Sequence, residues 1–144
     1  MSFKNILIAV DDSEFAAQAA KVAVELARPL KARLGFVHVF DPTVGPGTMW
    51  SVPADRLMES SEEQAKRLLA RFQAETAQKA KAAEFLESGK PASRIVHVAK
   101  KWPADLIVMG SHGRGKIKGL ILGSVSQEVL SHAPCPVLVV QAKS

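Results

Sequence analysis

Five short apolar runs, rich in β-branched residues, are separated by segments in which apolar residues recur every three or four positions. A continuous run such as Ile-Leu-Ile-Ala-Val indicates a strand buried on both faces, as in parallel sheets covered by helices. The alternation predicts βαβ units, and hence an α/β fold with one doubly wound, open, parallel five-stranded sheet and four helices. The strands are expected at Asn5 to Val10, Leu34 to Phe40, Ala82 to Glu87, Asp105 to Met109 and Pro136 to Gln141.

The helices are placed by their caps as well as by their periodicity. The first follows Asp11-Asp12-Ser13, where Ser13 or Asp12 can cap it, and Pro29 is expected beyond its last turn. The other three are expected from about Ala54 to Lys79, after the turn at Gly89 and Pro91, and from Leu120 to Ser131 with Leu122, Val125 and Val129 on one side.

Length and composition favour a single domain, residues 1–144. A chain of 144 residues, 47% of them hydrophobic, can bury enough apolar surface to fold around one core. The continuous apolar run before Asp11 has only five residues, too few for a signal peptide, and no run approaches the roughly 18 apolar residues of a membrane span. With Cys135 as its single cysteine, the chain is expected to be cytoplasmic, without membrane or disulfide.

The basic residues are dispersed. Lys and Arg total 19 against 14 Asp and Glu, and the tight group is Arg114, Lys116 and Lys118. A diffuse excess of this kind is more typical of a solvated surface than of nucleic-acid binding, so no nucleic-acid partner is expected.

A glycine-rich segment follows the fourth strand directly. It runs Gly110-Ser-His-Gly-Arg-Gly-Lys-Ile-Lys-Gly119, and the next helix opens near Gly123-Ser124. Glycines let backbone N–H groups approach an oxyanion, and a helix N-terminus adds partial positive charge, so the segment predicts a phosphate site. The Walker motif is absent, because Gly115-Lys116 precedes Ile117, and the first strand lacks the dinucleotide fingerprint.

The spacing Gly110-x2-Gly113-x9-Gly123-Ser124 resembles the nucleotide motif of the universal stress protein family. Lys4 to Ser13, His38-Val39, Ala104 to Arg114 and Pro134 to Val140 resemble further family segments in the same order. The chain is thus similar to a single-domain member of the ATP-binding branch, with an adenine nucleotide alpha hydrolase-like fold. The resemblance implies strand order 3-2-1-4-5 and a ligand at the carboxyl ends of strands one and four.

Residue roles follow from the same resemblance. Asp11 would lie near the adenosine or a metal, and Val39 would contact the adenine. The remaining cofactor-binding positions are Met109, Gly110, Ser111, His112, Gly113, Arg114, Gly123, Ser124 and Val125. The implied cofactor is ATP, or ADP or AMP, with or without Mg²⁺, and no catalytic or protein metal-ligand residue is assigned. Family members commonly dimerise through the last strand, which implies a homodimer formed by antiparallel pairing of Pro136 to Gln141.

Simpler interpretations remain open at several positions. Asp11 and Asp12 can cap the first helix, and His112 can be an ordinary loop residue. The glycines can serve a turn that needs positive φ. His38 is expected to be a hydrogen-bonded core histidine, and Cys135 a packing residue.

Three functions are compatible with the sequence. The leading hypothesis is a nucleotide-binding regulatory protein of the stress response, with an unidentified protein partner. The others are a slow ATPase or phosphotransferase, with His112 or Asp11 as general base, and a nucleotide-free interaction module. The preferred nucleotide, the metal requirement and the role of the loop from Thr43 to Pro53 stay open. At position 12 the family often has glycine, whereas this chain has Asp12. Its negative charge would recruit Mg²⁺ or weaken triphosphate binding.

Overall fold

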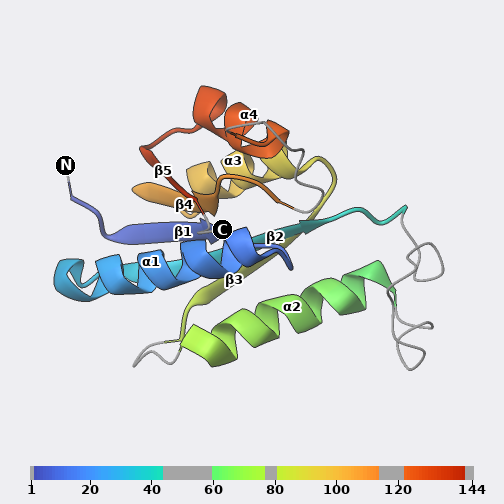
Figure 1. Ribbon diagram of the computed structural model, residues 1–144, viewed down its shortest axis with the longest axis horizontal. Helices are drawn as coiled ribbons and strands as arrows, with labels where there is room; N and C mark the ends of the chain where they lie inside the picture. The colour runs from blue at the N-terminus through green and yellow to red at the C-terminus, as the bar shows by residue number, and fades with distance from the viewer. Residues whose placement is uncertain (1, 44–59, 77–80, 114–121, 142–144) are drawn as a thin grey trace.

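A parallel sheet with strand order β3-β2-β1-β4-β5 forms the centre of the computed structural model (Figure 1). The structure describes residues 2–43, 60–76, 81–113 and 122–141. Within them the strands are β1 (Asn5–Ala9), β2 (Arg33–Phe40), β3 (Ala83–Ser88), β4 (Leu106–Gly110) and β5 (Val137–Val140). The helices in the same ranges are α1 (Glu14–Leu30), α2 (Ser61–Thr76), α3 (Pro91–Lys101) and α4 (Ser124–His132). The predicted fold class and strand order are confirmed.

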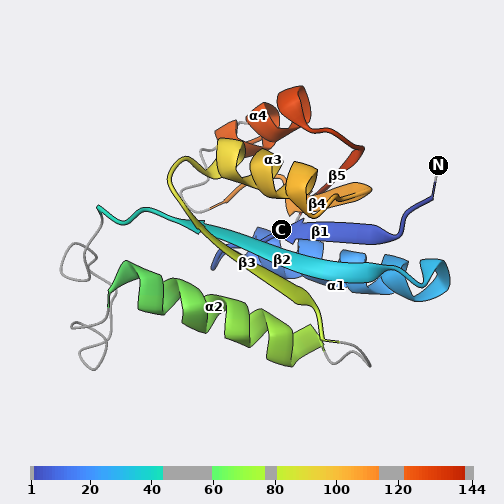
Figure 2. The same ribbon diagram turned by 180° about the vertical axis from the view of Figure 1, so that it is seen from behind.

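The helices cover both faces of the sheet, α1 and α2 on one side and α3 and α4 on the other (Figures 1 and 2). Successive residues of β1 point to opposite faces, so Ile6 and Ile8 join the cluster under α1 and α2, whereas Leu7 and Ala9 join the cluster under α3 and α4. This two-sided burial explains why the strand is an uninterrupted apolar run.

The direction of winding reverses at β1. From β1 the sheet continues through β2 to β3 on one side, and through β4 to β5 on the other. Pairing with β2 extends to Ala9↔Val37, while pairing with β4 extends to Ile8↔Val108. A crevice therefore forms beyond the carboxyl ends of β1 and β4, the place where open α/β sheets bind ligands.

The first helix is longer than the sequence predicts. Pro29, expected beyond its last turn, lies inside α1, which ends at Leu30. A proline this close to the end removes a single N–H group, and the helix stops where Lys31 adopts a left-handed backbone with φ of 52°.

The start of α2 also differs from the prediction. Ser60 is not helical: its Oγ accepts the N–H of Glu63 at 3.1 Å and donates to the Glu63 carboxylate at 3.2 Å. The Ser60 hydroxyl thus caps the helix, which begins at Ser61 and is not continuous from Ala54 as predicted. The predicted helix ends and all of the loop after Thr43 lie outside the described residues.

The start of α4 differs in the same way. Gly123 is the N-cap, with φ of −75° and ψ of 166°, so the helix begins at Ser124 and not at Leu120. Leu122, expected on the inner side of that helix, precedes it instead. The first turn of α4 consequently starts immediately beside the end of β4.

Cys135 is half-buried and packs against the cluster under α3 and α4. Burial is the main cause that raises the pKa of its thiol, and the nearby Asp105 carboxylate is the second. A raised thiol pKa reduces the thiolate fraction, which agrees with a packing role. In the described part of the chain, no helix is long and apolar enough to cross a membrane.

Candidate functional site

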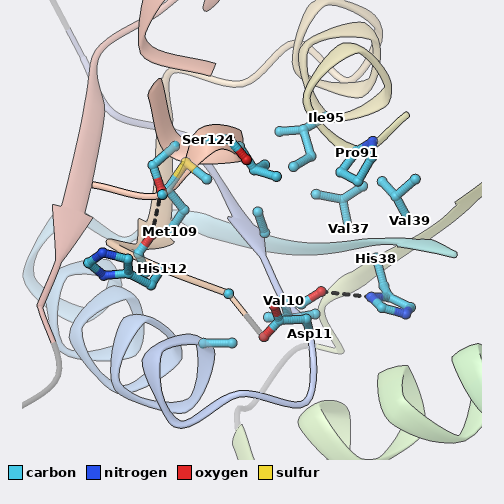
Figure 3. Close-up of a pocket in the computed structure, with 17 residues that line it drawn as sticks. Val10, Asp11, Val37, His38, Val39, Pro91, Ile95, Met109, His112 and Ser124 are labelled. Atoms are coloured by element: carbon cyan, nitrogen blue, oxygen red, sulfur yellow. Dashed lines mark hydrogen bonds between the residues drawn. The ribbon is translucent and has the colours of Figure 1, made fainter. Parts of the chain in front are cut away.

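A pocket of about 300 Å³ lies in the crevice at the carboxyl ends of β1 and β4 (Figure 3). It is bordered by residues of β1, β2, β4, α1, α3 and α4 and by the segments that follow β1 and β4. Most of the predicted cofactor-binding residues line it: Asp11, Val39, Met109, Gly110, His112, Gly113, Gly123, Ser124 and Val125. Ser111 lies behind the lining, 2% exposed. Arg114 lies outside the described residues.

Asp11 divides its two carboxylate oxygens between the helix and the pocket. Oδ1 accepts the N–H of Ser13 at 2.8 Å and also the Ser13 hydroxyl. Ser13 in turn caps α1 by accepting the N–H of Ala16 at 3.2 Å. Oδ2 faces Gly113, where a Cβ would lie 2.7 Å away. The N-cap of α1 is therefore Ser13, and not Asp11 or Asp12. One oxygen of Asp11 is engaged with Ser13 and the other faces the segment after β4, while Asp12 is exposed and does not line the pocket.

Gly110 and Gly113 are required for close approach rather than for unusual dihedrals. A Cβ on Gly110 would lie 2.6 Å from the Phe15 Cβ and 2.9 Å from the Phe15 carbonyl carbon, because α1 packs directly on β4 there. Among the described glycines, positive φ occurs at Gly89, with 120°, and not at Gly110, Gly113 or Gly123. Glycine is thus needed because a side chain at Gly110 would overlap with α1, and a side chain at Gly113 would overlap with the Asp11 carboxylate.

Two amides of the glycine segment are engaged within the chain. The Ser111 N–H donates to the Val140 carbonyl at 2.9 Å, and the Gly123 N–H donates to the Ser111 carbonyl at 2.7 Å. The glycine-rich segment was expected to bind an anion through its backbone amides. The amides of Ser111 and Gly123 already have acceptors within the chain and are therefore excluded from that role. The amides of Ser124 and Val125, in the first turn of α4, have no acceptor within the helix, and Gly123 provides no side-chain cap.

Ser126 is a site residue that the sequence motif did not reveal. Its buried hydroxyl lies 2.9 Å from the Gly110 carbonyl and 3.1 Å from the Ser111 carbonyl. The contact joins the first turn of α4 to the end of β4, and so fixes the helix N-terminus relative to the crevice.

The two histidines at the pocket have defined partners. His112 is buried, its ring centroid lies 5.3 Å from that of Phe15, and its Nδ1 lies 3.1 Å from the Ser111 Oγ. It is therefore a packed wall residue rather than an ordinary loop residue. His38 is hydrogen-bonded, as expected, through Nδ1 to the Val10 carbonyl at 2.8 Å, but it is half-buried at the pocket rather than in the core.

The opposite end of the pocket is apolar. Val37 and Val39 of β2 lie beside Pro91 and Ile95 of α3 (Figure 3). Neither α3 residue was predicted as part of the site, although Pro91 at the first position of α3 marks where that helix begins. The pocket thus combines an apolar end with a polar end formed by Asp11, Gly113 and the start of α4.

Among the described residues, no group of three or more His, Cys, Asp and Glu side chains is placed so that it could hold a metal ion. The Asp11 carboxylate lies beside Gly113, the last described residue of the segment after β4.

Comparisons with known proteins agree with this architecture. The model of the universal stress protein family matches residues 2–141. A universal stress protein encoded in the QAH/OAS sulfhydrylase 3' region of Thermus aquaticus is 40% identical over 139 residues, covering 96% of this chain and 99% of the relative.

Two solved structures extend the comparison. The universal stress protein UspA from Lactobacillus plantarum superposes with a TM-score of 0.79 at 30% identity, covering 97% of this chain and 99% of that chain. The universal stress protein from Archaeoglobus fulgidus in complex with dAMP superposes with a TM-score of 0.63 at 26% identity, covering 97% of this chain and 99% of that chain.

Proposed function

The chain belongs to the universal stress protein family, and we propose that it is a regulatory protein of the stress response that binds an adenine nucleotide in the crevice between β1 and β4. The observation that carries this proposal is the pocket itself, which has an apolar end at Val39 and Ile95 and a helix N-terminus at its polar end. A nucleotide has the same two parts, an aromatic base and an anionic phosphate group. The family member whose structure was solved in complex with dAMP supports the choice of an adenine nucleotide.

The residues present suit such a ligand. The amides of Ser124 and Val125 would face phosphate oxygens, where the dipole of α4 favours negative charge. Val39, with the α3 residues opposite, would contact the adenine, and Asp11 would lie near the ribose or a metal. ATP, ADP and AMP are all candidates, with or without Mg²⁺.

Regulatory binding is preferred to turnover because of how the candidate bases are held. His112 Nδ1 is paired with the Ser111 hydroxyl, and one oxygen of Asp11 is paired with Ser13. A general base has to reach the attacking water at hydrogen-bond distance. These contacts engage His112 Nδ1 and Asp11 Oδ1 with neighbouring groups, so that of these two residues Asp11 Oδ2 is the atom shown facing the crevice.

Calorimetric titration with ATP, ADP and AMP, each with and without Mg²⁺, tests the proposal. We expect saturable binding of at least one nucleotide at one site per chain, with no product released over many turnovers. Absence of binding by all three would favour a nucleotide-free interaction module, and repeated turnover would favour an ATPase or phosphotransferase. Mass spectrometry of any ligand that co-purifies would identify the preferred nucleotide.

We further propose that the protein is a homodimer joined through β5. This strand is at the edge of the sheet, and its four apolar residues, from Val137 to Val140, are only half-buried. An open apolar edge strand favours pairing with another chain, and pairing of two copies by a two-fold axis would be antiparallel.

A substitution at Val139 tests the dimer. The Val140 carbonyl accepts a hydrogen bond from Ser111 beside β4, so in an extended strand the N–H of Val139 points outward. A Val139→Pro protein would lose that outward donor and should become monomeric in light scattering at micromolar concentration. Val139→Thr keeps the N–H and the branched shape and should remain dimeric. A monomeric wild-type protein would refute the dimer directly.

A further inference from the structure

His38 completes the pairing between β1 and β2 at the point where the two strands separate. The last backbone bond between them runs from the Val10 N–H to the Val37 carbonyl at 2.9 Å. The Val10 carbonyl, directly after β1, accepts a hydrogen bond from the His38 Nδ1 at 2.8 Å instead (Figure 3). Val10 is only 6% exposed, and a buried carbonyl without a partner costs free energy. The imidazole ring therefore takes the place of a backbone donor.

The hydrogen bond fixes more than one atom. The Val10 carbonyl and the Asp11 N–H belong to one planar peptide unit, and no cis peptide occurs among the described residues, so the two groups point in opposite directions. Since the carbonyl is held toward β2, the Asp11 N–H is turned toward the side on which β4 lies. His38 thus sets the orientation of the backbone from which the Asp11 side chain leaves.

Asp11 is held from its other side by α1. Its Oδ1 accepts from Ser13, and its Oδ2 is left facing Gly113 across the crevice. The position of Oδ2 depends on two contacts. One is the hydrogen bond from Ser13 to Oδ1, and the other is the orientation of the Val10–Asp11 peptide plane. Ser13 is close to Asp11 in the sequence, whereas the peptide plane is held by His38, a side chain of β2.

We propose that His38 is a positioning residue of the nucleotide site, which acts by holding the Val10–Asp11 peptide through its Nδ1–H group. The inference rests on the proposed function, because it assigns a role within that site. Its ring does not need to touch the ligand. In Figure 3 the ring lies on the far side of β2 from the apolar end of the pocket, while its Nδ1 points to the Val10 carbonyl.

The geometry dictates a tautomer. A carbonyl oxygen can only accept, so Nδ1 must carry the proton, and the neutral ring must have its lone pair on Nε2. Nitrogen-15 NMR of the wild-type protein, at a pH where the ring is neutral, should identify His38 as the Nδ1–H tautomer. The Nε2–H tautomer would overturn the proposal without any ligand being added.

Two substitutions of matched chemistry separate positioning from packing. In His38→Asn the amide nitrogen occupies nearly the place of Nδ1, whereas in His38→Gln it occupies nearly the place of Nε2. We expect His38→Asn to bind the nucleotide within about threefold of the wild type. We expect His38→Gln to raise the dissociation constant by about tenfold or more, the factor that corresponds to loss of one well-placed hydrogen bond.

The outcomes are distinct. Equal affinity of His38→Gln and wild type, or equal loss in both variants, overturns the proposal, because a packing role would not distinguish the two amides. Thermal unfolding of each variant shows whether a loss of affinity accompanies a loss of folding. If the wild-type protein binds no nucleotide, the proposed function fails, and the tautomer measurement still decides whether His38 holds the peptide.

Discussion

A Gly110→Ser protein should lose about 3 kcal/mol of its free energy of unfolding. Its new Cβ would lie 2.6 Å from the Phe15 Cβ and 3.0 Å from the Phe15 carbonyl oxygen, distances at which atoms overlap. The atoms in conflict belong to the backbone and Cβ of α1, so no side-chain rotation relieves the overlap. The helix would have to move away from β4, and urea denaturation would show a lower midpoint.

The same substitution at another glycine of the motif is the control. A Cβ on Gly123 would lie no closer than 3.4 Å to its neighbours, and this residue is the N-cap of α4, where serine is favoured. Gly123→Ser should therefore unfold within about 0.5 kcal/mol of the wild type. If both serine variants were equally stable, the close packing of α1 on β4 would be wrong.

A Gly113→Val protein should fold but lose at least about a hundredfold in nucleotide affinity, which corresponds to roughly 3 kcal/mol of binding free energy. Gly113 is exposed, and the nearest atom to a Cβ at this position would be the Asp11 Oδ2, at 2.7 Å. A branched side chain there would displace the carboxylate and enter the crevice, while the core clusters remain intact.

Calorimetry and thermal unfolding of the same variants check this expectation. Gly113→Ala carries the smallest side chain in the same direction and should show an intermediate loss of affinity. Both variants should unfold close to the wild-type temperature. Full affinity in a folded Gly113→Val protein would remove the crevice from consideration as the nucleotide site.

Local pattern was enough to predict the strands, and the family resemblance supplied their order. The run Ile6-Leu-Ile-Ala-Val10 could be interpreted as a buried strand because both neighbouring layers require apolar residues. The sequence also contains signals for the observed starts of α2 and α4. Ser60 precedes Glu63 by three residues, a spacing typical of a helix start, and Gly123 directly precedes Ser124.

The rest of the site depends on contacts between distant segments. Pro91 and Ile95 face β2 only after α3 has packed on the sheet, and nothing local indicates which side of the helix borders a pocket. The partner of Gly110 is likewise invisible in the sequence, since Phe15 lies 95 positions earlier and approaches only because α1 crosses β4. Strand periodicity also could not reveal that His38 bonds to Val10.

The partition of the interior by the sheet has a consequence for variation in this protein. The crevice draws its apolar wall mostly from the layer under α3 and α4, while the layer under α1 and α2 is a separate cluster. Substitutions at residues such as Leu68 and Phe72 of α2 are therefore compensated by changes within their own cluster. Their effects on the free energy of unfolding should be additive with those of substitutions near Ile95. One half of the molecule can be redesigned for robustness while the ligand preference of the other half is kept.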